Sequence, residues 1–228
     1  MMNLEKAIEA VKKGKMILLF DAEDREGETD LVIPALNTTP LDIARMRCDG
    51  GGLICVAIYG KAADRLGLPY MSELLKSVSL NGHSSLRSLV EKKGDIPYDS
   101  RSSFSLWVNH RKTFTGITDN DRALTITRIG ESVKRVLNGE EIDFGSEFRS
   151  PGHVALLRAS SGLLDERRGQ TELSIVLALK AGITPSMVVC EMLDAITGKA
   201  LSKEKAKKYS VLNNMPFIEG KDLLDCVF

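Results

Sequence analysis

The sequence predicts an α/β fold of the α+β type, in which a mixed β-sheet carries helices packed on its faces. Short apolar runs alternate with amphipathic helical patterns, but without the strict βαβ repetition of an all-parallel sheet. The loop at 21–30 joins two of the apolar runs directly, which also favours a mixed sheet. The length of 228 residues fits one compact domain spanning 1–228, with two small domains as the alternative.

The first quarter of the chain holds the clearest strand signals. Asn3 is placed to cap a helix that ends at Gly14, and Pro40 occupies the first position of a short helix running to about Cys48. Three glycines at 50–52 end that helix. We therefore expect strands at 16–20, 31–33 and 53–58, each apolar enough to be buried.

The remaining elements follow from alternation and helical spacing. We expect strands at 103–108, 154–157 and 187–190, and helices at 122–137, 171–181 and 202–209. Residues 72–100 are polar and contain Gly and Ser, so we interpret them as the least ordered internal region and allow for one helix there. The lysines of 202–209 are interpreted as a solvated helical face.

Composition excludes several classes of function. Lys plus Arg and Asp plus Glu both number 31, and a zero net charge argues against nucleic acid as the main partner. No apolar run approaches the ~18 residues of a membrane span, and the N-terminus does not resemble a signal peptide. The four cysteines show neither CxxC pairing nor metal-ligand spacing, and Cys55 and Cys190 lie in apolar runs, as free buried thiols do. We therefore expect the protein in the reducing cytoplasm. Neither GxGxxG nor GxxxxGK[ST] occurs, which removes the common nucleotide-binding readings.

The most informative stretch is the acidic loop, residues 21–30. Six of its ten residues are acids and only Arg25 is basic. Carboxylates held together between two buried strands repel one another unless a cation neutralises them. Mg²⁺ prefers oxygen ligands and takes one or two protein carboxylates with water and substrate. The alternative is an ordinary solvated acidic turn.

Three later stretches could accompany the acidic loop. His153 follows a Pro-Gly pair at the start of a strand, where an imidazole suits proton transfer or serves a purely structural hydrogen bond. Residues 167–172 combine two arginines, a glycine and a threonine at a helix start, which suits a monophosphate or is simply a helix cap. Glu191 ends an apolar strand and is either a site carboxylate or a surface residue.

Together these stretches resemble the 3,4-dihydroxy-2-butanone-4-phosphate synthase family of riboflavin biosynthesis, in its stand-alone form. The resemblance rests on 24–30, 51–55, 68–71, 113–123, 149–154, 168–172 and 190–191, in the family's order and across nearly the whole chain. It implies a lyase that converts D-ribulose 5-phosphate to 3,4-dihydroxy-2-butanone 4-phosphate and formate. It also implies dependence on Mg²⁺, with Mn²⁺ as a further candidate, and a homodimer with sites at or near the subunit interface.

The resemblance also implies roles for individual positions. Glu26 would be the metal ligand of the loop, while Arg25 and Asp30 would hold the substrate. The phosphate would bind at Arg168, Gly169 and Thr171. The catalytic residues would be His153, Glu191 and Glu28, and either Thr115 or Thr118 would reach substrate, including that of the partner subunit.

One position departs from the family pattern. The family usually has a metal-binding histidine where this chain has Gln170, whose carbonyl oxygen suits Mg²⁺ at least as well as an imidazole does. We therefore expect the metal site to survive with Glu26 and Gln170 as ligands, and Gln170 to contact substrate as well. The alternative is a non-catalytic sugar-phosphate-binding protein on the same fold.

Overall fold

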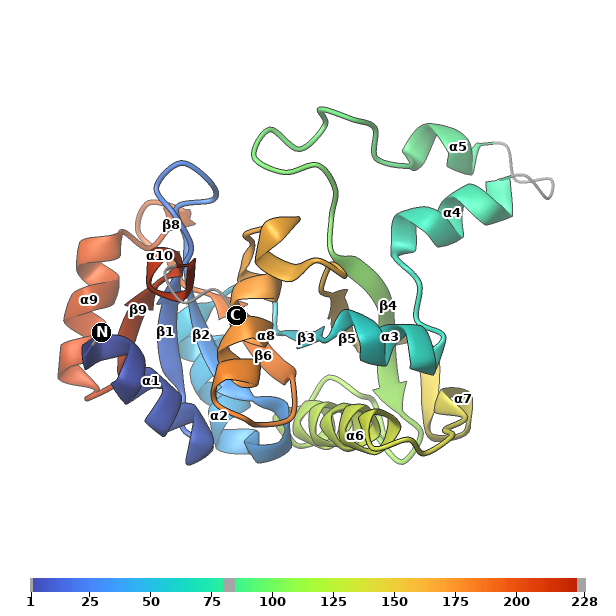
Figure 1. Ribbon diagram of the computed structural model, residues 1–228, viewed down its shortest axis with the longest axis horizontal. Coiled ribbons are helices and arrows are strands. Elements are labelled where there is room, and N and C mark those ends of the chain that lie inside the picture. Colours follow the sequence, from blue (N-terminus) through green and yellow to red (C-terminus); the bar gives the residue numbers. More distant parts are fainter. Residues whose placement is uncertain (1, 80–84, 225–228) are drawn as a thin grey trace.

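The computed structural model describes residues 2–79 and 85–224, and its centre is a seven-stranded mixed sheet (Figure 1). The strand order is β4-β5-β3-β6-β2-β1-β9. The strands are β1 (Ile17–Phe20), β2 (Thr29–Pro34), β3 (Cys55–Ile58), β4 (Phe104–His110), β5 (Phe148–Arg158), β6 (Ser186–Glu191) and β9 (Phe217–Glu219). The β3–β5 and β1–β9 pairs are parallel and the other pairs are antiparallel. The predicted mixed sheet is confirmed.

Helices cover both faces of this sheet. One face carries α1 (Met2–Lys12), α8 (Gln170–Lys180) and α10 (Gly220–Leu224). The other face carries α2 (Pro40–Arg45), a π-helix (Met46–Gly50), α3 (Gly60–Leu66), α6 (Asp119–Leu137) and α9 (Lys203–Leu212). The remaining elements are the helices α4 (Met71–Ser79), α5 (Leu86–Leu89) and α7 (Phe144–Glu147), the 3-10 turns Ala35–Asn37 and Leu163–Asp165, and a hairpin of β7 (Leu193–Asp194) and β8 (Lys199–Ala200).

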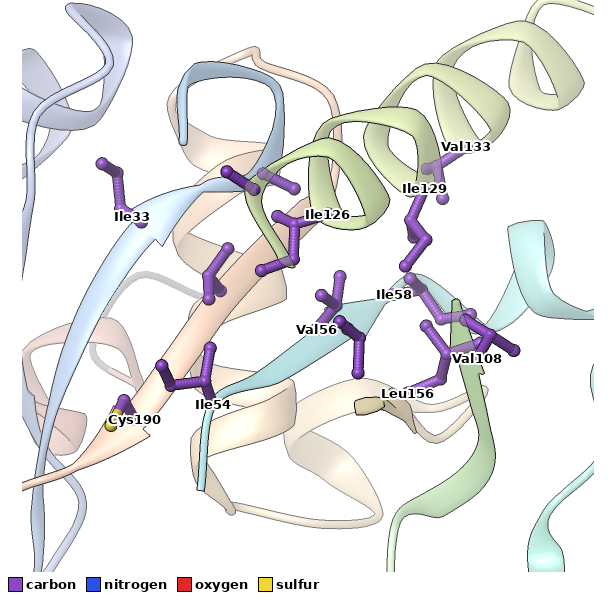
Figure 2. Close-up of a cluster of buried hydrophobic side chains, with 14 of the residues drawn as sticks. Ile33, Ile54, Val56, Ile58, Val108, Ile126, Ile129, Val133, Leu156 and Cys190 are labelled. Carbon is purple, nitrogen blue, oxygen red and sulfur yellow. The ribbon is translucent and has the colours of Figure 1, made fainter. Parts of the chain in front are cut away.

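The two faces are filled by alternate residues of the same strands. In β3, Val56 and Ile58 enter the cluster beneath α6, while Cys55 and Ala57 enter the cluster beneath α8. Figure 2 shows the first cluster, with Ile126 of α6 above the strand residues. Because both faces are covered, every residue of β1 and β3 is buried, which explains their uninterrupted apolar sequences. No helix within the described ranges is long and apolar enough to cross a membrane.

Two predicted regions differ in detail. The polar region 72–100 contains α4 and α5, and the chain from Val90 to Ser103 then returns without regular structure to β4 (Figure 1). The segment 149–153 is not a turn before a strand, because β5 already begins at Phe148. A register shift in the β4–β5 pairing, between Val108 and Asn109, accommodates these extra residues.

The lysine-rich helix is also more than a solvated face. The Lys203 side chain is only 18% exposed, and its ammonium group bonds Glu23 at 3.0 Å and Glu219 at 2.9 Å. It also lies 4.3 Å from the centre of the Phe20 ring. The sequence favoured a solvated face for these lysines and did not show that the acidic loop lies against Lys203. Lys203 thereby links the first residues of α9 to the acidic loop.

Candidate active site

The acidic loop is organised by its first residue, Asp21. One carboxylate oxygen of Asp21 accepts the backbone N–H of Glu26 at 3.0 Å, and the other accepts that of Glu28 at 3.0 Å. Gly27 lies between them with a φ of 68°, a value that glycine adopts without strain. The loop is therefore folded around a buried carboxylate, which fixes Glu26 and Glu28 on its inner side.

Asp30 and Glu191 meet where β2 and β6 pair. They are direct partners in the antiparallel register, and Asp30 is almost fully buried. Burial, and then the neighbouring charges of Glu191 and Glu26, hold the pKa of Asp30 well above its usual range. Glu191 is fixed by the backbone N–H of Leu53, which donates to it at 2.8 Å. Gly52 is needed here because a Cβ atom would lie 2.4 Å from the Glu191 carboxylate.

The start of α8 provides the facing wall. Gly169 is the N-cap, and no side chain caps the helix, so the first N–H groups remain available to an anion. The amide nitrogen of Gln170 donates to the carbonyl of Leu19 at 3.1 Å and to that of Glu28 at 3.2 Å. Its amide oxygen is buried without a hydrogen-bond partner. Two fixed donor bonds therefore hold an unsatisfied oxygen at this wall.

A buried ionic network joins the loop to α8. Asp99 accepts from Arg25 at 2.5 Å and lies 2.6 Å from the Nε atom of Arg167. Arg25 also contacts Glu26 at 3.0 Å, and Arg167 contacts Glu172 at 2.6 Å. Burial opposes the charge of Arg25, but Glu26, Asp99 and Asp21 outweigh it and raise the pKa of Arg25.

These groups line one cleft of about 310 Å³. Its charged lining comprises five carboxylates, from Glu26, Glu28, Asp30, Asp99 and Glu191, and three arginines, Arg25, Arg101 and Arg167. The lining thus holds two more carboxyl groups than guanidinium groups. Burial, followed by Glu26 and Glu191, raises the pKa of Glu28 to about 7. A cleft of this kind suits a divalent cation, because the cation would remove the repulsion among the acids.

Most of the predicted site residues meet in this cleft. Arg25, Glu26, Glu28, Asp30, Gln170, Thr171 and Glu191 all line it. Gly169 adjoins the cleft. Its lack of a side chain allows both arginines to approach, because a Cβ atom there would lie 2.2 Å from Arg167 and 2.8 Å from Arg25. Arg168 is exposed and outside the lining, and its Nε atom is 3.5 Å from the carbonyl of Leu164. Arg167 is the neighbouring arginine that faces the cleft.

His153, Thr115 and Thr118 lie elsewhere. His153 is exposed on β5 and contacts Asn109, whose amide also donates to the carbonyl of Thr115 at 3.3 Å. Thr118 caps α6 by accepting the N–H of Asp121 at 3.1 Å. These three residues do not line the cleft in this chain. His83, another histidine of the chain, lies outside the described residues.

Two functional candidates were not predicted from sequence. Asp99 belongs to a polar stretch with no motif, and the neighbouring sequence does not indicate that it pairs with Arg25. Arg167 was part of the helix-start pattern, but the pattern does not show which of two adjacent arginines turns inward.

A larger hollow of about 970 Å³ lies beyond this network and shares Arg25, Asp99 and Arg167 with the cleft, but Glu28, Gln170 and Glu191 do not line it.

Comparison with known proteins assigns the chain. A family model described as 3,4-dihydroxy-2-butanone 4-phosphate synthase matches residues 5–226. The chain belongs to this family. It is 57% identical over 223 residues to the synthase of Methanosarcina mazei, covering 98% of this chain and 90% of that protein. It is 57% identical over 224 residues to the synthase of Archaeoglobus fulgidus, covering 98% and 93%. The family places the chain among the lyases of riboflavin biosynthesis.

Solved structures of the family share the fold. The Candida albicans synthase superposes with a TM-score of 0.74 at 28% identity, covering 97% of this chain and 95% of that one. A synthase crystallised in complex with two magnesium ions gives a TM-score of 0.76 at 25% identity, covering 96% and 94%. These neighbours confirm the predicted fold class and support the use of a divalent metal by the family.

The residues of this chain fit such a metal. No group of three or more His, Cys, Asp or Glu side chains among the described residues could hold an ion alone. The unpartnered amide oxygen of Gln170 and the carboxylate of Glu26 line the same cleft, and one oxygen of Asp30 is also buried without a partner. Oxygen donors in small number, completed by water and substrate, match the coordination that Mg²⁺ prefers.

Proposed function

We propose that this protein converts D-ribulose 5-phosphate to 3,4-dihydroxy-2-butanone 4-phosphate and formate in the cleft between the acidic loop and α8. The observation that carries the proposal is that Glu26 and the unsatisfied oxygen of Gln170 line one cleft, beside a helix N-terminus that no side chain caps. This combination offers a place for a divalent cation next to a place for a phosphate.

The residues divide the work between binding and proton transfer. Gly169, Thr171 and the first N–H groups of α8 bind the phosphate, and Arg167 neutralises it from inside the cleft. A contribution of Arg168, as the family resemblance implies, would come from outside the lining. Fixing the phosphate holds the flexible sugar chain in one place, which raises the effective concentration of the reacting carbons.

Glu28 and Glu191 are the proton-transfer groups of the cleft. With its pKa near 7, Glu28 both takes up and returns a proton under physiological conditions. Glu191 keeps one carboxylate oxygen on the Leu53 N–H, which leaves the other for substrate. Arg25 and Asp30 orient the substrate hydroxyls. A bound Mg²⁺, or Mn²⁺, supplies electrostatic stabilisation of negative charge that develops on substrate oxygens.

We further propose a homodimer that completes the site. His153 and Thr115 lie outside the cleft of their own chain, so a second subunit is needed to bring this group of residues to the substrate. Thr118 would act there through the start of α6, which it caps. The three cysteines of known placement, Cys48, Cys55 and Cys190, are free thiols, which supports a reducing, cytoplasmic location.

The decisive assay measures formate released from ribulose 5-phosphate with and without Mg²⁺. We expect Mg²⁺-dependent formate release, and expect the Glu26→Gln variant to lose at least about 100-fold in kcat/KM while remaining folded. A folded wild-type protein that binds ribulose 5-phosphate without releasing formate would instead indicate the sugar-phosphate-binding alternative. Undiminished turnover by Glu26→Gln would remove the acidic loop from the mechanism.

A further inference from the structure

Asn109 lies outside the cleft, is fully buried and contacts His153 twice. Its side-chain oxygen accepts the backbone N–H of His153 at 2.8 Å. Its side-chain nitrogen lies 3.0 Å from Nδ1 of the His153 ring and 3.3 Å from the carbonyl oxygen of Thr115. One amide therefore binds the main chain and the ring of the same histidine.

The backbone around Asn109 is shaped for this contact. Val108 pairs with Val154 and Asn109 pairs with Arg149, so residues 150–153 form an extra segment on β5. A Cβ atom on Gly152 would lie 2.0 Å from the carbonyl carbon of Val108. A Cβ atom on Gly116, whose φ is 95°, would lie 2.0 Å from the Asn109 amide nitrogen. Two glycines thus allow the main chain to close around one asparagine.

The orientation of the Asn109 amide is determined by its partners. A backbone N–H can only donate, so the atom that meets the His153 N–H must be oxygen. A carbonyl oxygen can only accept, so the atom that meets Thr115 must be nitrogen. Both contacts give the same orientation. The atom facing the imidazole is therefore an amide N–H₂ group, which has protons to donate and no lone pair to offer.

From this geometry we infer that Asn109 is a positioning residue that fixes the neutral tautomer of His153. A proton on Nδ1 would face the amide protons, so the neutral ring accepts at Nδ1 and carries its proton on Nε2. Because His153 is exposed, Nε2 is the ring nitrogen that meets a ligand. In its neutral form His153 then presents a hydrogen-bond donor, not a base, to a substrate oxygen.

This inference rests on the proposed function for the identity of the substrate, but its main test requires no turnover. The protonated nitrogen of each histidine is identified by long-range ¹⁵N–¹H NMR correlation at about pH 8, where imidazoles are neutral. The chain has three histidines, and His153→Asn assigns the signals of His153. We expect wild-type His153 to be protonated at Nε2, and a proton at Nδ1 would overturn the inference.

The matched variants are Asn109→Asp and Asn120→Asp, which make the same chemical change at a buried and an exposed asparagine. A carboxylate at position 109 accepts a hydrogen bond from an Nδ1–H group, so we expect the Nδ1–H to Nε2–H ratio of His153 to rise at least about tenfold. Asn120→Asp should leave the ratio unchanged. An unchanged ratio in Asn109→Asp would assign Asn109 a purely structural role.

Comparing kcat between two variants of His153 shows whether its ring acts as a hydrogen-bond donor in the reaction. The side-chain N–H₂ of glutamine can replace an Nε2–H donor but not a base. If formate is released, we expect His153→Gln to retain about tenfold more of the wild-type kcat than His153→Ala. Equal losses in the two variants would contradict the donor role. Absence of formate release by the wild type would refute the proposed function and leave the tautomer measurement standing.

Discussion

Replacing Asp99 by asparagine tests whether the segment before β4 holds the two inward-facing arginines. The substitution keeps the shape of the side chain and removes its charge. Asp99 is 6% exposed and contacts Arg25 at 2.5 Å and Arg167 at 2.6 Å. Hydrogen bonds to charged groups contribute about 1.5–3 kcal/mol each. Asparagine keeps one acceptor oxygen, and both arginines keep other acidic partners, so we expect a loss of about 2 kcal/mol in the free energy of unfolding.

Urea denaturation followed by far-ultraviolet circular dichroism measures this loss, with Glu166→Gln as the matched control. Glu166 is a nearby acid whose side chain is 51% exposed and lies 4.0 Å from Arg101, so its neutralisation should change stability by less than about 0.5 kcal/mol. Equal losses of stability in the two variants, or a loss below about 0.5 kcal/mol for Asp99→Asn, would refute the expected contribution of the network to stability. We also expect Asp99→Asn to raise KM for ribulose 5-phosphate more than it lowers kcat, since it frees the arginines from one orientation.

Three further predictions concern the cleft and the residues around Asn109. The pKa of Glu28 is raised from 4.5 to about 7, so the folded protein holds a proton that the unfolded chain releases. Metal-free stability should therefore fall as pH rises from about 4.5 to 7, and Mg²⁺ binding near pH 6.5 should release protons, measurable by calorimetry in two buffers of different ionisation enthalpy. The Gln170→His variant should favour Mn²⁺ over Mg²⁺ relative to wild type in metal-titration experiments, and equal preference in both forms would exclude Gln170 as a ligand. The Gly116→Ala variant should lose at least about 2 kcal/mol more than Gly139→Ala in urea denaturation, because both glycines have positive φ but only at 116 does a Cβ atom meet Asn109.

The sequence predicted the elements whose pattern is local. β1 and β3 are fully apolar, and β6 is apolar from Met187 to Cys190, because helices cover both faces of the sheet. Helical spacing predicted both ends of α8 to within one residue, and it predicted the end of α6, although α6 begins at Asp119, earlier than predicted. The short helix α3 was not predicted, and α4 was allowed for only as one helix within the polar region. The three-residue β9 was also missed, because its partner β1 is distant in sequence and a strand of that length carries no usable alternation.

The residues themselves indicated the acidic loop and the helix start as parts of one site. The roles of Glu26, Glu28 and Gln170 came from the family resemblance and stay predictions, and the structure brings all three residues into one cleft. Asp99 could not be predicted, because only its contacts with Arg25 and Arg167 mark it as a site residue. Both arginines are distant from it in the sequence, and its own segment has no regular secondary structure. Its partner Arg167 could not be chosen over Arg168 either, because the direction of a side chain just before a helix depends on the packing of the preceding turn.

The anchored amide of Gln170 gives the two walls of the cleft different responses to acid. An imidazole at that position would take up a proton below about pH 6.5 and lose its lone pair to it. An amide does not titrate in this range, and its donor bonds to Leu19 and Glu28 keep the same oxygen turned inward. In the proposed metal site, acidification would therefore weaken cation binding only through the carboxylates of the loop, and the Gln170 oxygen would remain able to coordinate as soon as those acids ionise.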